Sequence, residues 1–370
     1  MHPTAEPDYD DRDTIPPPVF YAEQALLGAL LLQPHRLADI TGVSPDSFNH
    51  HPHMALFNAM RSQPAPDARR HATTTAWLDH VLAAAREQAP GLTSAHLHLL
   101  VQSCPSPRHA PAYARIVESE HARRRLIRAA QRLARTARDT SHPDPVPATL
   151  ADADALTAVV NDIAARFPAR SALLPRTPTP EPTAVHDTEE AIDEEQLLLA
   201  TATAHPDDIE RTRWLNQNDF AHPLHAGLWQ CLTALARRRE PVDPVTVLWE
   251  AQQRRLLTPG TEPADLLTLL ATPTGSLEHW GIRILQRALL TTAHEVARRI
   301  EAFTNDPATT PHQFILGSRR VLVGLTSVRT RWHRATAPAS SVVKPQRARG
   351  SPPRPSPSRS WVSAAPRISR

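Results

Sequence analysis

Four arginines in the first half of the chain have a spacing suited to binding anions. They follow one another at steps of four, four and three residues: Arg124, Arg128, Arg132 and Arg135. In a helix this spacing places four guanidinium groups along one face. Such a stripe either lies against the phosphates of a nucleic acid or forms the solvated face of a helical hairpin. The sequence leaves both interpretations open.

Histidines provide a second cluster, at positions 50, 51 and 53, but no Cys or carboxylate joins them at the spacing of metal ligands. His53, and His225 in a corresponding position, are expected to cap or pack a short helix. The lone lysine, Lys344, follows Val343 and precedes Pro345, so the Gly-Lys-Ser/Thr end of a phosphate-binding loop is absent. We therefore predict a protein that is not an enzyme and that has no metal and no cofactor.

Charge is distributed unevenly along the 370 residues. The formal net charge is only +3, yet after Asp306 the chain holds 12 basic residues and no acidic ones. The end of the chain, residues 335–370, is rich in Pro, Ser and Arg, so we expect it to be disordered. It either binds nucleic acid without regard to sequence or merely keeps the chain soluble. The residues expected to bind are Lys344, Arg347, Arg349, Arg354 and Arg359.

Hydrophobic runs and cysteines indicate the compartment. The longest apolar run, from Ala25 to Leu32, is far shorter than the roughly 20 residues that cross a bilayer. The acidic start of the chain lacks the apolar core of a signal peptide. Cys104 and Cys231 stand far apart without zinc-site spacing. These features predict a cytoplasmic protein with no membrane association.

The chain contains one unit twice. Residues 22–28 resemble residues 194–200 at an offset of 172, which also carries Phe48 onto Phe220 and Phe57 onto Trp229. The same offset places Trp77 on Trp249, and further along it shortens to 168. Since aromatic positions are retained, we predict a duplication. The aromatic residues expected to anchor the cores are Phe48, Phe57, Trp77, Phe220 and Trp229.

Each copy has the hydrophobic period of helices, so the predicted fold class is all-α. Long helices are expected from about 111 to 138 and from about 277 to 303. A closing helix follows each, at 150–167 and at 311–331. Gly28 falls inside a helix, where a small residue suggests that a neighbouring helix approaches closely. We divide the chain into a disordered acidic lead (1–17), copy 1 (18–167), a Pro-rich linker (168–190), copy 2 (191–334) and the basic tail (335–370).

The first copy contains a characteristic set of residues: the Ala22–Gly28 segment, Phe48 with His53, and Tyr113-Ala114-Arg115-Ile116-Val117, which opens the long helix. On these residues it resembles the N-terminal domain of the DnaB-type replicative helicase. The second copy resembles the family more weakly, since Gly281 occupies the place of Tyr113. In that family the domain is a helical head followed by an antiparallel hairpin. Hairpins pair into dimers that build a collar on the hexamer, and the collar engages primase. The motor lies in a separate ATPase domain.

The resemblance therefore implies a collar module without a motor. We expect a non-catalytic adaptor that is associated with DNA replication and binds the replicative helicase, primase or both through its hairpins. The alternative is a nucleic-acid-binding protein that acts through its basic tail. We expect the hairpins to pair either between the two copies or with another chain, so the oligomeric state stays open. The expected hairpin contacts are Tyr113, Ile116, Val117, Ile127, Leu133, Trp280, Ile284 and Leu285.

Overall fold

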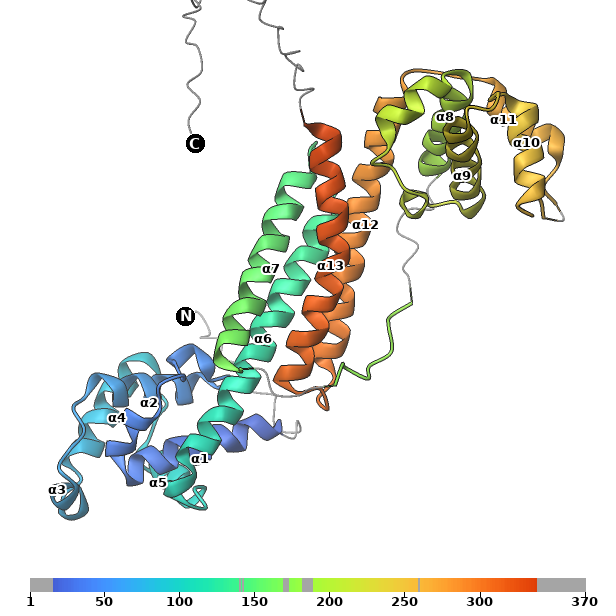
Figure 1. Ribbon diagram of the computed structural model, residues 1–370. Coiled ribbons are helices and arrows are strands. Elements are labelled where there is room, and N and C mark those ends of the chain that lie inside the picture. The colour runs from blue at the N-terminus through green and yellow to red at the C-terminus, as the bar shows by residue number, and fades with distance from the viewer. Residues whose placement is uncertain are drawn as a thin grey trace, which may run out of the picture. The chain divides into compact units, whose positions relative to one another are not determined.

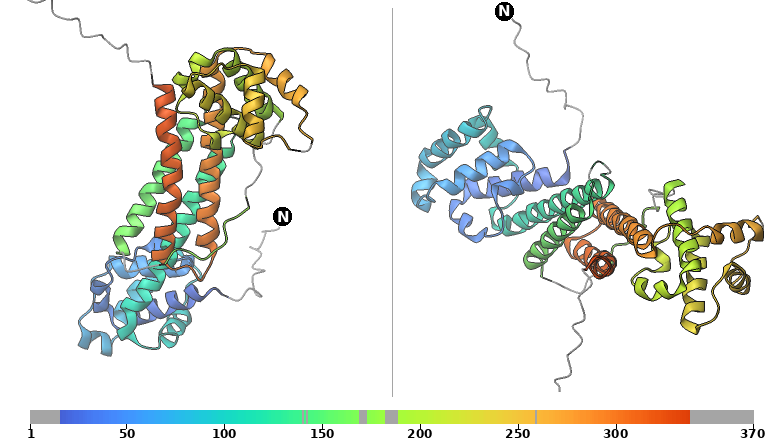
Figure 2. Two further views of the ribbon diagram at one scale, coloured as in Figure 1. Left: turned by 45° about the vertical axis from the view of Figure 1, so that its right-hand side comes forward. Right: turned by 90° about the horizontal axis from the view of Figure 1, so that it is seen from above.

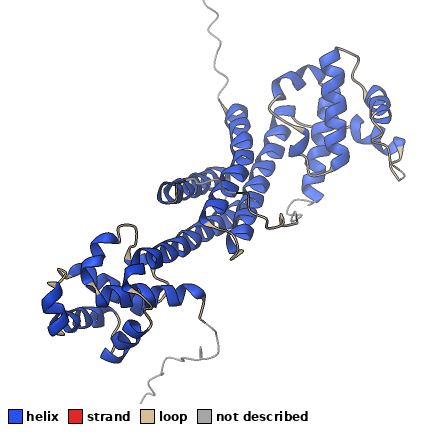
Figure 3. Cartoon of the chain, turned by 60° about the horizontal axis from the view of Figure 1, so that its bottom comes forward, coloured by secondary structure: helices blue, strands red, loops and turns tan. Residues whose placement is uncertain are grey.

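The computed structural model describes residues 16–139, 141, 143–168, 173–181, 189–258 and 260–337. Regular structure in these residues is helical and includes no strand (Figure 3), which confirms the all-α prediction. None of the described helices combines the length and apolarity that crossing a membrane would require. The acidic lead up to residue 15 and the five basic tail residues expected to bind nucleic acid lie outside the described residues.

The first head consists of short helices gathered around α1 (Figure 1). Its elements are α1 (Pro18–Leu32), η1 (Pro34–Asp39), η2 (Pro45–Ser47), α2 (His51–Ser62), α3 (Ala68–Thr73), α4 (Ala76–Gln88), α5 (Ser94–Gln102) and η3 (Pro107–His109). Phe48, Phe57 and Trp77 are buried in its core, as predicted. The N-terminal part of the long helix α6 (Ala110–Arg138) completes this core with Ala110, Ala114 and Val117.

The second head repeats most of this order. Its elements are α8 (Glu189–Ala204), η4 (Pro206–Thr212), η5 (Gln217–Asp219), α9 (Pro223–Arg238), α10 (Pro244–Gln253) and α11 (Pro263–Ala271). Helices α9, α10 and α11 begin with proline, whose fixed φ and missing N–H suit the first helical position. The long helix α12 (Leu277–Asn305) closes the core with Leu277, Ile284 and Leu285. Trp229 is buried in this core and Phe220 packs against it.

The predicted equivalence of Trp77 and Trp249 is wrong. Trp77 is only 9% exposed, whereas Trp249 is 61% exposed. The buried positions of α10 are Val247 and Ala251. Val247 lies two residues before Trp249, and two residues turn a helix by about 200°, which moves a side chain to the opposite face. Matching the two tryptophans at a constant offset therefore failed, because the copies differ in the length of the segment before this helix.

The two long hairpins lie side by side (Figures 1 and 2). They are α6 with α7 (Val146–Arg166), and α12 with α13 (Pro311–Thr336). A single core joins all four helices, and it includes Leu126, Leu133, Leu156, Ile300 and Phe314. No pair of elements packs more extensively than α6 and α12. The helices from Pro18 to Ala335 accordingly belong to one compact unit.

Gly28 confirms the prediction of a close helix approach. A Cβ atom placed on it would lie 2.1 Å from the backbone oxygen of Leu100 in α5, and 2.9 Å from Cβ of Cys104. The nearest neighbour is backbone and cannot move aside cheaply. Any larger residue at position 28 must therefore push α1 away from α5.

We expect Gly28→Ala to lower the free energy of unfolding by about 2 kcal/mol, because overpacking a close-packed contact forces the backbone to shift. Gly324→Ala is the matched control, since Gly324 also lies inside a helix and its added Cβ meets nothing within 4 Å. The free energy of unfolding of this control should rise by about 0.5–1 kcal/mol, because alanine has a higher helix propensity than glycine. Urea denaturation of the two variants measures both effects, and equal stability would contradict the packing argument.

Candidate functional site

The paired hairpins contain the residues that the sequence singled out for partner binding. Helices α6 and α12 run antiparallel, because Arg123 contacts Thr304 whereas Ala134, further along α6, lies beside the earlier residue His294. The contact faces are rich in alanine, including Ala129 and Ala130 on α6 and Ala297 on α12, all buried. Small side chains let two helix backbones approach closely. The chain thus joins its two long hairpins within one molecule.

Burial inside the chain corrects part of the site prediction. Val117, Leu133, Ile284 and Leu285 are no more than 1% exposed and face cores of their own chain. They are not available to a separate protein in this structure. Their hydrophobic spacing marked burial inside the chain, since periodicity cannot distinguish an internal partner from an external one.

The other four predicted contacts are more accessible. Tyr113, Ile127 and Trp280 are half-buried, and Ile116 is 48% exposed on α6. Trp280 donates its indole N–H to the carbonyl of Thr274, 2.6 Å away. Gly281, in the place of Tyr113, packs under Trp214: a Cβ there would lie 2.8 Å from the indole ring. In the second copy the contact between the head and the long helix is therefore made by Trp214, and not by a residue at the position of Tyr113.

The predicted arginine stripe is only partly exposed. Arg124 is half-buried and donates to the carbonyl of Ser47 at 2.7 Å, and burial lowers the pKa of its guanidinium. Arg132 lies 3.7 Å from the carboxylate of Asp152. Arg128 and Arg135 are exposed. The stripe thus combines one structural arginine and one ion-paired arginine with two that face solvent.

Arg123 is not among the predicted site residues, yet it links the two copies directly. Its guanidinium donates to the backbone carbonyls of Thr304, Asp306 and Thr309, at 2.8 Å for Asp306 and 2.7 Å for Thr309. These carbonyls lie at the end of α12 and just beyond it, where the helix cannot supply partners itself. The ring of Phe314 lies below the same guanidinium, 5.9 Å from its carbon. One side chain of copy 1 therefore satisfies the turn of copy 2.

A buried Glu–His pair occurs once in each head. In the first, the Glu23 carboxylate lies 2.8 Å from Nδ1 of His53 and accepts the backbone N–H of Asn49 at 2.6 Å. In the second, Glu195 lies 2.8 Å from Nδ1 of His225 and accepts the N–H of Ala221 at 2.6 Å. The pair ties the first helix of each head to the start of its fourth element. The expectation that His53 and His225 are structural agrees with this geometry, whereas the glutamates were visible only as part of the repeated segment.

Histidines crowd around the first pair without forming a metal centre. His50 and His53 have ring centroids 4.5 Å apart, and His96 lies 5.9 Å from His53. Burial, together with the charge of His53, lowers the pKa of His50 to about 4. Within the described part of the chain, no three His, Cys, Asp or Glu side chains are arranged to hold a metal ion.

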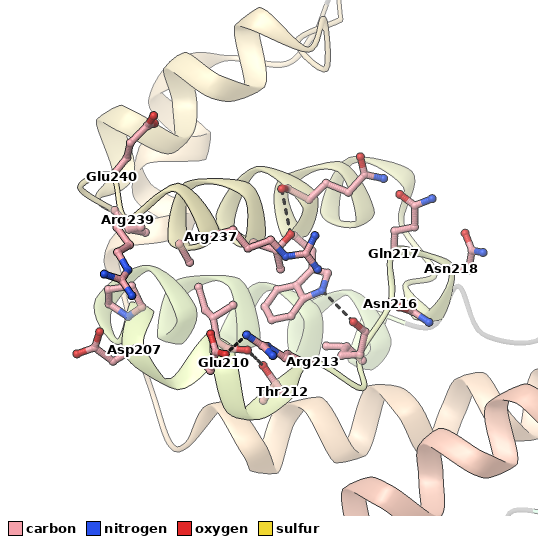
Figure 4. Close-up of a pocket in the computed structure, with 18 residues that line it drawn as sticks. Asp207, Glu210, Thr212, Arg213, Asn216, Gln217, Asn218, Arg237, Arg239 and Glu240 are labelled. Atoms are coloured by element: carbon pink, nitrogen blue, oxygen red, sulfur yellow. Dashed lines mark hydrogen bonds and ion pairs between the residues drawn. The ribbon is translucent and has the colours of Figure 1, made fainter. Parts of the chain in front are cut away.

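The second head also carries an open groove of about 920 Å³ between α9 and the segment from η4 to η5 (Figure 4). Trp229 lines it and donates its indole N–H to the carbonyl of Leu215 at 3.4 Å. Charged side chains lie on both sides. Asp207 and the ion-paired Glu210 and Arg213 lie on one side, and Arg237, Arg239 and Glu240 lie on the other. No sequence motif pointed to this groove, because its lining comes from two segments that only the fold brings together.

Arg123→Gln should lower the free energy of unfolding by about 2–3 kcal/mol, since it leaves carbonyls at the end of α12 without their donors. Hydrogen exchange at residues 304–310 should accelerate at the same time. Arg128→Gln, an exposed arginine on the same helix, serves as the control and should change neither quantity. Unchanged exchange in Arg123→Gln would show that the link between the copies is not a stabilising one.

Glu23→Ala and Glu195→Ala should each lower the free energy of unfolding by about 2–4 kcal/mol. Each leaves a buried imidazole and a buried backbone N–H without a hydrogen-bond partner. The two losses should be similar, since the contacts of the two pairs have the same lengths. Thermal unfolding checks both, with Glu87→Ala on the exposed face of α4 as the neutral control. A loss confined to one head would mean that the pairs are not equivalent.

Comparison with known proteins supports the resemblance. The family model described as the DnaB-like helicase N terminal domain matches residues 15–119 and 187–280. The replicative DNA helicase DnaC of Bacillus subtilis is 34% identical over 129 residues, which cover 33% of this chain and 27% of that protein. The replicative DNA helicase DnaB of Geobacillus stearothermophilus is 35% identical over 129 residues, covering 33% and 26%. No solved structure matches the chain.

The chain thus spans about a quarter of the length of these two helicases. The family match, by contrast, covers more than half of the chain and falls on both copies, ending in the third turn of α6 and in the first turn or so of α12. Both matched segments contain helices and no strand where the structure describes them, and both carry the buried Glu–His pair. The chain belongs to the DnaB-like helicase N-terminal domain family.

Proposed function

We propose that this protein is a non-catalytic, replication-associated adaptor that presents a collar dimer within a single chain. The observation that supports the proposal most strongly is the pairing of α6 with α12, which joins the hairpins of both copies in one core. Because the hairpin of each copy finds its partner in the same molecule, pairing needs no second chain. The partners proposed are the replicative helicase, primase or both.

Exposed apolar side chains on the helices of the hairpins are the proposed contacts. Ile116 on α6 is 48% exposed, and Leu316 and Val323 on α13 are 40% and 67% exposed. An exposed apolar side chain on a stable helix can anchor a protein partner, because binding removes its apolar surface from water. Of the buried residues, Leu133 then acts by holding the two hairpins together, whereas Val117, Ile284 and Leu285 hold the long helices to their heads.

The proposal is tested by size-exclusion chromatography of the full chain with the helicase and with the primase of the same organism. We expect co-elution with at least one of them at micromolar concentration. Ile116→Asp should raise Kd at least about tenfold, a loss of about 1.4 kcal/mol. Val245→Asp is the control, because Val245 is 66% exposed but lies on α10, outside the hairpins. Absence of co-elution with either protein would refute the adaptor role.

A further inference from the structure

One buried imidazole at the contact between the two copies has an unused ring nitrogen. His294 on α12 is 4% exposed, and its Nδ1 donates to the carbonyl of Ala134 on α6 over 3.3 Å. Because that bond places the proton on Nδ1, Nε2 of the neutral ring is an acceptor. Nε2 is buried and has no hydrogen-bond partner among the described residues. An unmet hydrogen bond of this kind costs stability, so a position that keeps one is a candidate for binding a ligand.

His294 lines an open hollow of about 320 Å³ together with two arginines from the last turn of α6. The lining consists of Ala134, Arg135, Arg138, Asp139 and His294. Arg135 and Arg138 are exposed, and neither forms an ion pair with another described residue, in contrast to Arg132. Asp139 accepts the backbone N–H and the hydroxyl of Ser141. The lining therefore carries two positive charges and one negative charge while the imidazole is neutral.

The corresponding place at the other end of the contact lacks these basic groups. The offset of 168, which relates the two long helices, pairs each basic residue with one that is not basic: His294 with Leu126, Arg135 with Phe303, and Arg138 with Asp306. Leu126 and Phe303 are buried in the shared core. Apolar side chains thus fill that place without an unmet hydrogen bond. The histidine and the two arginines occur together only at the end where α6 finishes.

The electrostatics of the hollow favour an anion. Burial lowers the pKa of His294 more than its hydrogen bond to Ala134 raises it, and the charges of Arg138 and Arg298 lower it further. A bound anion offsets these charges, so it would raise that pKa again and let a protonated Nε2 donate to it. Phosphate offers three acceptor oxygens to the two guanidinium groups and the imidazole, whereas a carboxylate offers only two.

We propose that Arg135, Arg138 and His294 bind a phosphate group, carried by a nucleic acid or by a free nucleotide. The two arginines supply the charge, and His294 takes up a proton as the phosphate binds. The site joins α6 of one copy to α12 of the other, so it exists only where the copies are paired. It goes beyond the proposed function, and its test uses neither helicase nor primase. Either proposal can therefore fail while the other stands.

Sulfate is the first probe, because it is tetrahedral like phosphate and keeps both negative charges from pH 8 to pH 6. The full chain is titrated and followed by NMR at the backbone amides of residues 134–139 and at the Cε1–H of His294. We expect saturable shifts, with Kd falling at least about threefold from pH 8 to pH 6. A rise of one in the pKa of His294 on binding is worth up to tenfold in affinity. Absence of a saturable shift would overturn the proposal.

His294→Leu places the residue of the first copy in the second. This variant should bind sulfate more weakly, and its Kd should no longer depend on pH. Because it removes an unmet hydrogen bond, it should also unfold at a higher urea concentration than the natural sequence. A pH dependence that persists in His294→Leu would overturn the proposal, as would a loss of stability, which is the result expected of a merely structural histidine.

Arg138→Gln should weaken sulfate binding at least about tenfold, because it removes one of the two charges that hold the anion. Arg128→Gln is the matched control, since Arg128 is exposed on the same helix and does not line the hollow. An equal loss in both variants would mean general charge attraction and would overturn the proposal.

Two further probes distinguish the sources of the phosphate group. Tighter binding of thymidine 5′-monophosphate supports a free nucleotide, and tighter binding of a thymidine oligonucleotide without a terminal phosphate supports a nucleic acid. Thymidine itself should cause no shift. Binding of a hexaglutamate peptide as tight as that of both phosphate probes would assign the site to carboxylates and overturn the proposal.

Discussion

The antiparallel contact between α6 and α12 is the interaction on which the rest of the structure depends. Each long helix completes a head with its N-terminal part and enters the shared bundle with the remainder. Alanines at the contact let the helices approach closely, and larger residues such as Leu133 and Ile300 fill the core beside them. Without this contact each hairpin would expose an apolar face to water. Arg123 strengthens the arrangement where α12 ends.

Fusion of two copies has allowed them to diverge while the core design is kept. The Glu–His pair, with its helix-anchoring hydrogen bonds, is repeated with the same distances in both heads. Around it the copies differ: Trp214 packs against Gly281 in the second copy, whereas Gly42 lies against Glu118 in the first. The core pair is constrained because unpaired buried polar groups are costly, while surface positions are free to acquire separate roles.

Helix positions were predictable because local patterns decide them. Hydrophobic period, proline at helix starts and the glycine within α1 depend on neighbouring residues in the chain, and the long helices lie within two residues of their predicted starts and ends. The buried equivalent of Trp77 was missed, since loop length shifted the register of α10. The groove beside Trp229 was missed as well, because its two walls are distant in sequence.

Repetition and periodicity were enough to predict a duplicated all-helical chain, and a few residues of the first copy carried the resemblance to the DnaB-like N-terminal family, because each of these signals lies in residues close together in the chain. Which surfaces remain free was decided only by the tertiary structure. Val117 and Ile116 are adjacent and similar in chemistry, yet one is buried and the other is 48% exposed. A hydrophobic side chain favours burial, but the packing of helices distant in sequence determines which partner buries it.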